Sequence, residues 1–115
     1  MISTHILDLS QGAPAAGVNV RLLKMDVKKN DKKDGEQWLE VGKGTTNTDG
    51  RLSFDVKKSA GLYQIIFETE NYFKRLGQEA FFTDVPVIFK IENTERKYHV
   101  PLLLSAFGYS TYRGS

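Results

Sequence analysis

Histidine exchanges protons near neutral pH more readily than any other side chain, and this sequence contains only two, His5 and His99. Strand alternation predicts that His5 shares a face with Leu7, and that His99 shares a face with Pro101 and Leu103. Each position suits an ordinary half-buried histidine, and each also suits a general base. From the positions alone, both interpretations stay open.

Imidazole is a common metal ligand as well, so a metal site is a further alternative. A catalytic zinc ion takes three protein ligands, so the two histidines would need a carboxylate, and none lies at a suitable spacing. The sequence has no cysteine, which excludes disulfides, thiol nucleophiles and thiolate metal ligands. We therefore expect no metal and no other cofactor.

Arg51 directly follows an Asp-Gly pair, a strong turn signal, at the start of a predicted strand. An arginine at such a place is usually an exposed residue on the rim of a sheet. The sequence has no glycine-rich phosphate loop, no Gly-x-Ser-x-Gly and no His-Glu-x-x-His. No common enzyme motif therefore assigns a catalytic role to His5, His99 or Arg51.

The elements that must position these side chains are mostly strands. Apolar and β-branched segments of alternating pattern recur about every 8–15 residues, which is typical of an antiparallel sandwich or barrel. We predict about eight strands, at residues 3–9, 17–27, 36–46, 51–56, 61–69, 84–93, 97–105 and 106–115. The sequence therefore predicts an all-β fold.

One segment, 68–77, has the pattern of a short helix. Its apolar residues follow helical spacing and Gly77 would stop it, while the possible N-cap residues are Glu68, Thr69 and Asn71. The charge-dense run at 24–37 mixes lysines with aspartates between two predicted strands. We predict that this run forms a solvated hairpin loop rather than a phosphate or nucleic-acid site.

Size and charge limit the class of protein. A chain of 115 residues fits one domain spanning 1–115, and a net charge of +2 is too small for a typical nucleic-acid binder. No apolar run approaches the roughly 20 residues of a membrane span, and the first residues do not resemble a signal peptide. We expect a soluble protein that is located in the cytoplasm, with the peroxisome and the periplasm as alternatives.

Four segments of the sequence form a specific pattern: "STHILD", "GAPAAGVNVRL", "TNTDGR" and above all "YHVPLLLSAFGYSTYRGS". They closely resemble the 5-hydroxyisourate hydrolase family, the transthyretin-like enzymes of urate degradation. The resemblance runs from about Ser3 to Ser115. It implies a transthyretin-like (prealbumin-like) eight-stranded antiparallel β-sandwich with one short α-helix. It also implies a homotetramer, a dimer of dimers whose active sites lie in a channel where the dimers meet.

The resemblance assigns functions residue by residue. It implies catalytic roles for His5, Arg51, His99 and Ser115, and substrate contacts for His5, Arg51, Tyr112 and Arg113. In this assignment His99 activates water as the base, and Arg51 holds the substrate and stabilises the developing oxyanion. His5 would orient water or substrate and could itself be the base, while Ser115 and Tyr112 would complete the pocket by hydrogen bonding.

The family's reaction opens the six-membered ring of 5-hydroxyisourate by adding water across a ring amide, which gives 2-oxo-4-hydroxy-4-carboxy-5-ureidoimidazoline. Two alternatives belong to other classes. A carrier of the transthyretin type would bind a planar small molecule without turnover, although transthyretin lacks these histidines, this arginine and the Tyr-Arg-Gly-Ser ending. A non-catalytic β-sandwich interaction module would be a monomer. Neither the sequence nor the resemblance suggests a nucleic-acid or membrane partner.

Overall fold

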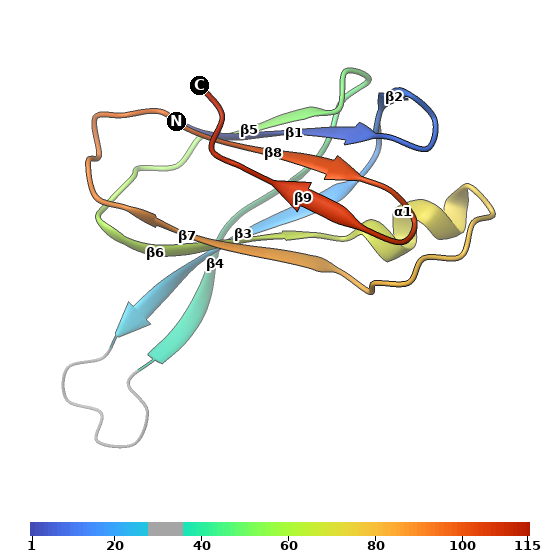
Figure 1. The fold of residues 1–115 in the computed structure, drawn as a ribbon. Helices are drawn as coiled ribbons and strands as arrows, with labels where there is room; N and C mark the ends of the chain where they lie inside the picture. Colours follow the sequence, from blue (N-terminus) through green and yellow to red (C-terminus); the bar gives the residue numbers. More distant parts are fainter. Residues whose placement is uncertain (28–35) are drawn as a thin grey trace.

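The protein folds as two β-sheets packed face to face, in a computed structural model that describes residues 1–27 and 36–115 (Figure 1). Between the sixth and seventh strands lies one helix, α1 (Thr69–Arg75). The strands are β1 (Ile2–Asp8), β2 (Ala13–Pro14), β3 (Asn19–Val27), β4 (Glu36–Thr45), β5 (Arg51–Phe54), β6 (Gly61–Phe67), β7 (Val85–Ile91), β8 (Tyr98–Leu104) and β9 (Tyr109–Thr111).

The first sheet has the order β2-β1-β8-β9, and β5 pairs with β1 as well. The second sheet has the order β4-β3-β6-β7. The strands β1, β5 and β8 carry the residues of interest, so three neighbouring strands of one sheet hold segments that are distant in sequence. This arrangement confirms the all-β sandwich with one short helix.

The eight-stranded, purely antiparallel arrangement is corrected in two respects. The described residues form nine strands, because Ala13–Pro14 folds back against the end of β1 as the two-residue β2. A strand of two residues is too short to produce an alternating pattern. The second correction is that β1 and β8 pair in parallel, from Ile2 opposite Tyr98 to Asp8 opposite Leu104. Alternation predicts which face a side chain occupies, but it carries no information on the direction of the partner strand.

The core lies between the two sheets and follows the alternation along each strand. In β1, Ile2, Thr4 and Ile6 are buried, while Ser3 and His5 between them are half-buried on the outer face. Burying one large aliphatic side chain contributes about 1.5–3 kcal/mol, so this alternation fixes which face of β1 meets the core. The same alternation keeps the His5 side chain on the outer face of the sheet.

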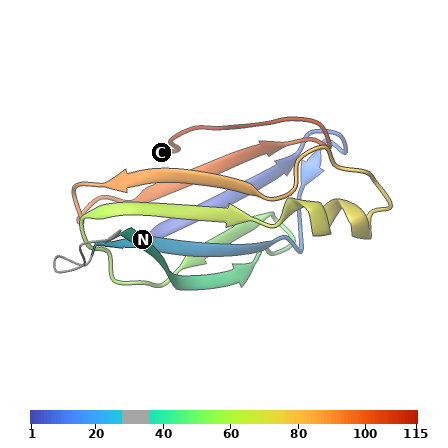
Figure 2. The same ribbon diagram turned by 90° about the horizontal axis from the view of Figure 1, so that it is seen from below.

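The helix α1 covers one end of the sandwich (Figure 2). Its Tyr72 and Phe73 are buried, and the chain leaves it through Gly77, whose φ of +72° suits glycine. The prediction of a helix at 68–77 is therefore confirmed, with Glu68 at the N-cap. The strand β3 ends at Val27 and β4 begins at Glu36, which are the bounds predicted for these two strands, so both strands extend into the charged run at 24–37. The rest of that run lies outside the described residues.

A buried carboxylate ties the helix to the first sheet. Asp8 is only 1% exposed, and its Oδ2 accepts a hydrogen bond of 2.8 Å from the Tyr72 hydroxyl. Its Oδ1 accepts from the Ser10 hydroxyl at 2.6 Å and from the Ser10 backbone N–H at 3.0 Å. Burial and the neighbouring carboxylate raise the pKa of Tyr72 well above its ordinary value, so the phenol stays a donor.

The change Tyr72→Phe should lower the free energy of unfolding by about 1–3 kcal/mol, because it leaves a buried carboxylate oxygen without this donor. Urea unfolding at a fixed protein concentration measures the difference. The matched control is Tyr109→Phe, which keeps the ring against Phe82 and removes a hydroxyl from an exposed side chain. Equal stability of the two variants would contradict the structural role given to the Asp8–Tyr72 pair.

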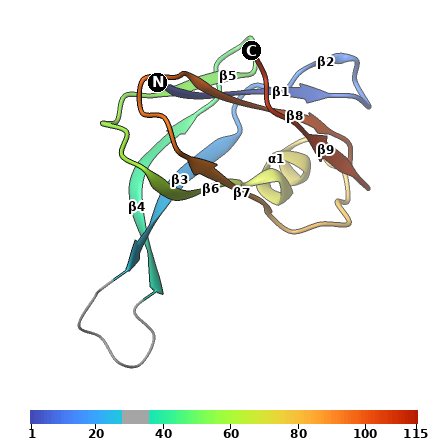
Figure 3. The same cartoon turned by 60° about the vertical axis from the view of Figure 1, so that its left-hand side comes forward.

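The two chain ends lie near one another on the side of the first sheet (Figures 1 and 3). The backbone N–H of Tyr98 donates to the carbonyl of Met1, and the segment after β9 runs back along β8. The described residues include no helix with the length and apolar character needed to cross a membrane.

Candidate active site

The register of three strands brings the predicted site residues together on the outer face of the first sheet. The antiparallel β1–β5 pair places His5 directly opposite Arg51. On the other side of β1, the parallel pairing with β8 places Ser3 opposite His99. Because side chains at i and i+2 share a face of a strand, Ser3 and His5 both point away from the core. The outer face therefore gathers two imidazoles and a guanidinium.

His99 is held by a hydrogen bond from its own sheet. Its Nδ1 lies 2.8 Å from the Ser3 hydroxyl oxygen, which can either donate to or accept from the ring. Where Nδ1 carries the proton and donates to Ser3 Oγ, the other ring nitrogen, Nε2, is free to accept a proton. The bond fixes the ring orientation and leaves one nitrogen for a reacting molecule.

The surroundings of His99 favour its neutral form. Burial lowers its pKa from the ordinary value, and the positive charge of Arg51 and the neighbouring His5 lower the pKa further. A histidine with a lowered pKa is mostly unprotonated at neutral pH, so it can accept a proton there. The site therefore pairs a permanent cation with a neutral base.

A cavity of about 250 Å³ opens beside these residues. Its walls carry hydroxyl and cationic groups from both ends of the chain and from β5, which suits a small polar ligand. The residues that line it are Met1, Ser3, Thr4, Arg51, Ser53, Lys97, His99 and Ser115. The structure therefore brings Arg51, His99 and Ser115 to one cavity, with His5 next to them across from Arg51.

The segment after β9 reaches this cavity by lying against His99. The backbone N–H of Gly114 donates to the His99 carbonyl at 2.8 Å, and Thr111 Oγ1 donates to the Pro101 carbonyl at 2.8 Å. A Cβ added to Gly114 would lie 2.5 Å from Cδ2 of the His99 ring, which is closer than carbon atoms approach without displacement. Only glycine lets the backbone pass this close to the imidazole.

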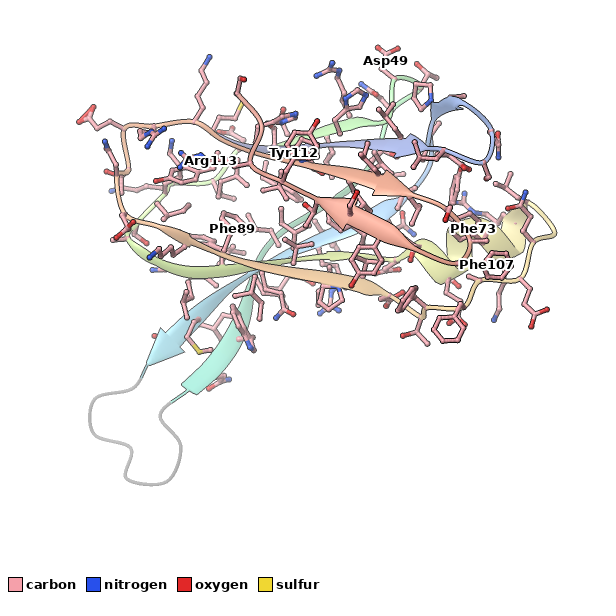
Figure 4. All side chains as sticks on the ribbon, viewed as in Figure 1. Asp49, Phe73, Phe89, Phe107, Tyr112 and Arg113 are labelled. Atoms are coloured by element: carbon pink, nitrogen blue, oxygen red, sulfur yellow. The ribbon has the colours of Figure 1, made fainter. Side chains whose placement is uncertain are left out.

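Tyr112 and Arg113 are placed differently from the other predicted residues. They line a second cavity of about 160 Å³, together with Phe89 and Tyr98, and His99 lies between the two cavities. Figure 4 shows both side chains on the segment beyond β9, with Phe89 below them in this view. The guanidinium carbon of Arg113 lies 4.9 Å from the centre of the Tyr98 ring. The structure therefore does not bring the Arg113 side chain to the cavity of Arg51 and Ser115.

Sequence reasoning missed Ser3, Ser53 and Lys97 as lining residues. Two of them could have been found, because Ser3 lies two residues before His5 and Ser53 two residues after Arg51 on predicted strands. Lys97 precedes β8 and carries no such signal. Within residues 1–27 and 36–115, no three His, Cys, Asp or Glu side chains come close enough to hold a metal ion.

Known proteins are similar to this chain in both sequence and fold. The profile of the HIUase/Transthyretin family matches residues 2–114. The 5-hydroxyisourate hydrolase of Mus musculus is 41% identical to this chain, over 99% of this chain and 94% of its own length. The 5-hydroxyisourate hydrolase of Klebsiella pneumoniae has a similar structure, with a TM-score of 0.80 at 35% identity, covering 99% of this chain and 98% of its own.

Sea bream transthyretin in complex with thyroxine is similar in structure as well, with a TM-score of 0.83, but at 26% identity, over 98% of this chain and 93% of its own. Backbone similarity alone therefore does not separate the hydrolases from the hormone carrier, whereas sequence identity is higher to the hydrolases. This chain belongs to the HIUase/Transthyretin family.

Proposed function

We propose that this protein hydrolyses 5-hydroxyisourate in urate degradation, through the residues on the outer face of its first sheet. The observation that carries the proposal is the meeting of Arg51 and the half-buried His99 at one polar cavity, with His5 beside them. Relatives at 41% and 43% identity carry the name 5-hydroxyisourate hydrolase. A carrier would have no need for a neutral base held next to a fixed cation.

In the proposed reaction a water molecule attacks the carbonyl carbon of a ring amide. Nε2 of His99 accepts a proton from this water while its Nδ1–H donates to Ser3 Oγ. The carbonyl oxygen becomes an oxyanion, which the guanidinium of Arg51 stabilises. The carbon–nitrogen bond then breaks, and the ring nitrogen leaves with a proton returned by His99. The open-chain carboxylate belongs to 2-oxo-4-hydroxy-4-carboxy-5-ureidoimidazoline.

The remaining residues take supporting roles in this proposal. His5, opposite Arg51, orients water or substrate, and it is the alternative base. Ser115 lines the cavity and is available to bind a polar edge of the substrate. Tyr112 lines the second cavity, on the other side of His99. Its hydroxyl would contact the substrate only if the substrate extended past His99 or the segment after β9 moved.

We further infer a homotetramer, as the family resemblance implies, and we propose a cytoplasmic location. Large apolar side chains are exposed along the turn into β9, including Phe107 at 73% and Tyr109 at 39%, which suits a surface that meets other subunits. Light scattering of the purified protein measures the assembly. A monomer would contradict the tetramer and would favour the interaction-module alternative.

The test of the activity uses 5-hydroxyisourate freshly generated from urate by uricase, with the protein present at a small fraction of the substrate concentration. A hydrolase accelerates the ultraviolet decay of many substrate equivalents per protein, and the rate is proportional to the protein concentration. A transthyretin-type carrier would bind at most a stoichiometric amount and leave the spontaneous decay of the remainder unchanged. The second result would overturn the proposal.

The change Gly114→Ala should lower kcat/KM by about 10²-fold, because displacing catalytic groups by about 1 Å can cost that much. The new methyl group would overlap the His99 ring, and this ring is held through Nδ1 by Ser3. The matched control is Gly108→Ala, where the nearest atom to an added Cβ is 4.0 Å away. Comparable activity of the two variants would show that the close approach at His99 is unimportant.

A further inference from the structure

The guanidinium of Arg113 lies over the face of a buried aromatic ring rather than in the substrate cavity. Its central carbon is 4.9 Å from the centre of the Tyr98 ring, which is within the range of a cation–π interaction. Tyr98 is 6% exposed, whereas Arg113 is an exposed residue. The contact therefore joins a surface side chain of the last segment to the edge of the core.

Tyr98 is a rigid platform for this contact. Its hydroxyl accepts hydrogen bonds from the backbone N–H groups of Glu92 at 3.3 Å and Asn93 at 3.2 Å, and it donates to the Asn93 carbonyl at 3.1 Å. Its ring also packs near that of Phe89, with the centroids 6.4 Å apart. These contacts hold the Tyr98 ring in place independently of the segment after β9.

Arg113 sits next to the residue that covers the base. Gly114 forms an isolated bridge with His99, and its backbone passes directly against the imidazole. Tyr98 and His99 are also neighbours, and they point to opposite faces of β8. The contact of Arg113 with Tyr98 therefore holds the segment on one face of β8, while Gly114 lies against the His99 ring and Ser115 lines the cavity on the other face.

We propose that Arg113 is a positioning residue for the hydrolysis, and that its contact with the Tyr98 ring holds Gly114 against His99 and Ser115 in the substrate cavity. This inference rests on the proposed function for its catalytic consequence. It replaces the expectation that Arg113 binds the substrate. The segment is otherwise tied to β8 by the Gly114 bond and, where it leaves β9, by the Thr111 bond, so losing the Arg113 contact would loosen its last residues.

Releasing the segment has a consequence for His99 that is independent of turnover. Burial is the largest cause of its lowered pKa, and Gly114 is part of what covers the ring. The charged and titratable neighbours that act on His99 are Arg51 and His5, and neither changes in an Arg113 variant. Uncovering the ring should therefore raise the pKa of His99 toward its ordinary value of about 6.5.

The experiment compares the full-length protein with Arg113→Met, Arg113→Lys and the control Arg96→Met. Arg96→Met removes an exposed positive charge that also acts on Tyr98 but belongs to the loop before β8, not to the segment after β9. Two measurements are made on each protein: the NMR titration of the imidazole signals and the steady-state rate with 5-hydroxyisourate. The chain has only two histidines, so a His5→Gln variant assigns the signals.

In Arg113→Met we expect a higher His99 pKa and a fall in kcat of about tenfold or more, with KM changed less than about threefold. Arg113→Lys should restore part of both values because an ammonium also binds an aromatic face. Arg96→Met should match the unchanged protein. If none of the proteins accelerated hydrolysis, the proposed function would be wrong. A His99 pKa that rose in Arg113→Met but not in Arg96→Met would still support the positioning contact.

Two results would overturn the inference. One is an unchanged His99 titration with unchanged kcat in Arg113→Met. The other is a large rise in KM with an unchanged His99 titration and no restoration by lysine, because a direct contact between Arg113 and the substrate predicts that pattern. Thermal melting of each variant at equal concentration accompanies both measurements, and Arg113→Met should melt within a few degrees of the unchanged protein because the side chain is exposed.

Discussion

Replacing His99 with alanine should lower kcat by about 10²–10⁴-fold, the usual contribution of a general base. The imidazole is held at Nδ1 by Ser3, and its lowered pKa keeps it neutral at the pH of the assay. Alanine provides no group at this position that can accept the proton of the attacking water. Initial rates with freshly generated 5-hydroxyisourate measure the effect.

A general-base role also predicts chemical rescue. Adding free imidazole to His99→Ala should recover part of the lost rate, because the deletion leaves space next to the cavity. The same additive should have no effect on the unchanged protein. A fall in kcat of less than threefold in His99→Ala would contradict the role of His99 and would turn attention to His5.

Replacing Arg51 with methionine should lower kcat/KM by about 10²–10³-fold, the range found when one oxyanion-stabilising donor is removed. It should also move the acid limb of the pH profile. The positive charge of Arg51 lowers the pKa of His99, so removing this charge raises that pKa. The base then becomes protonated at a higher pH, and kcat/KM falls off earlier as the pH is lowered.

Two further variants test whether Arg51 acts through its positive charge or through the planar geometry of its guanidinium. Arg51→Lys keeps a positive charge but lacks the planar fork, so the acid limb should stay near its original pH while much of the rate is lost. Arg21→Met removes an arginine from β3 in the other sheet, where it pairs with Glu40 at 2.9 Å. An equal loss of rate in Arg21→Met would show that the effect comes from net charge rather than from the site.

Much of the fold follows from patterns that the sequence displays directly. Alternation in residues 3–9 and 97–105 predicts that His5 shares a face with Leu7 and that His99 shares a face with Leu103, and the half-buried state of all four residues agrees. Gly77 and the apolar spacing before it predict the helix, because glycine accepts the positive φ found there. These predictions depend on local backbone preferences and on burial, which neighbouring residues determine.

The contacts that build the site depend on register, which local patterns do not contain. Ser3 meets His99 across 96 positions of sequence, and only the parallel pairing of β1 with β8 determines that distance. The direction of the Arg113 side chain depends on how the segment after β9 lies along β8. The family resemblance supplied the residues proposed to be functional, but it did not reveal that Arg113 lies on the Tyr98 ring.

The most direct test of the account compares two pKa values in the unchanged protein. One is the pKa of His99 from its NMR titration, and the other is the pKa on the acid limb of kcat/KM, which reports the free enzyme's essential base. If neutral His99 activates the water, the two values coincide and lie below about 6.5. An acid limb that follows the titration of His5 instead, or no acid limb across the titration of His99, would contradict the account.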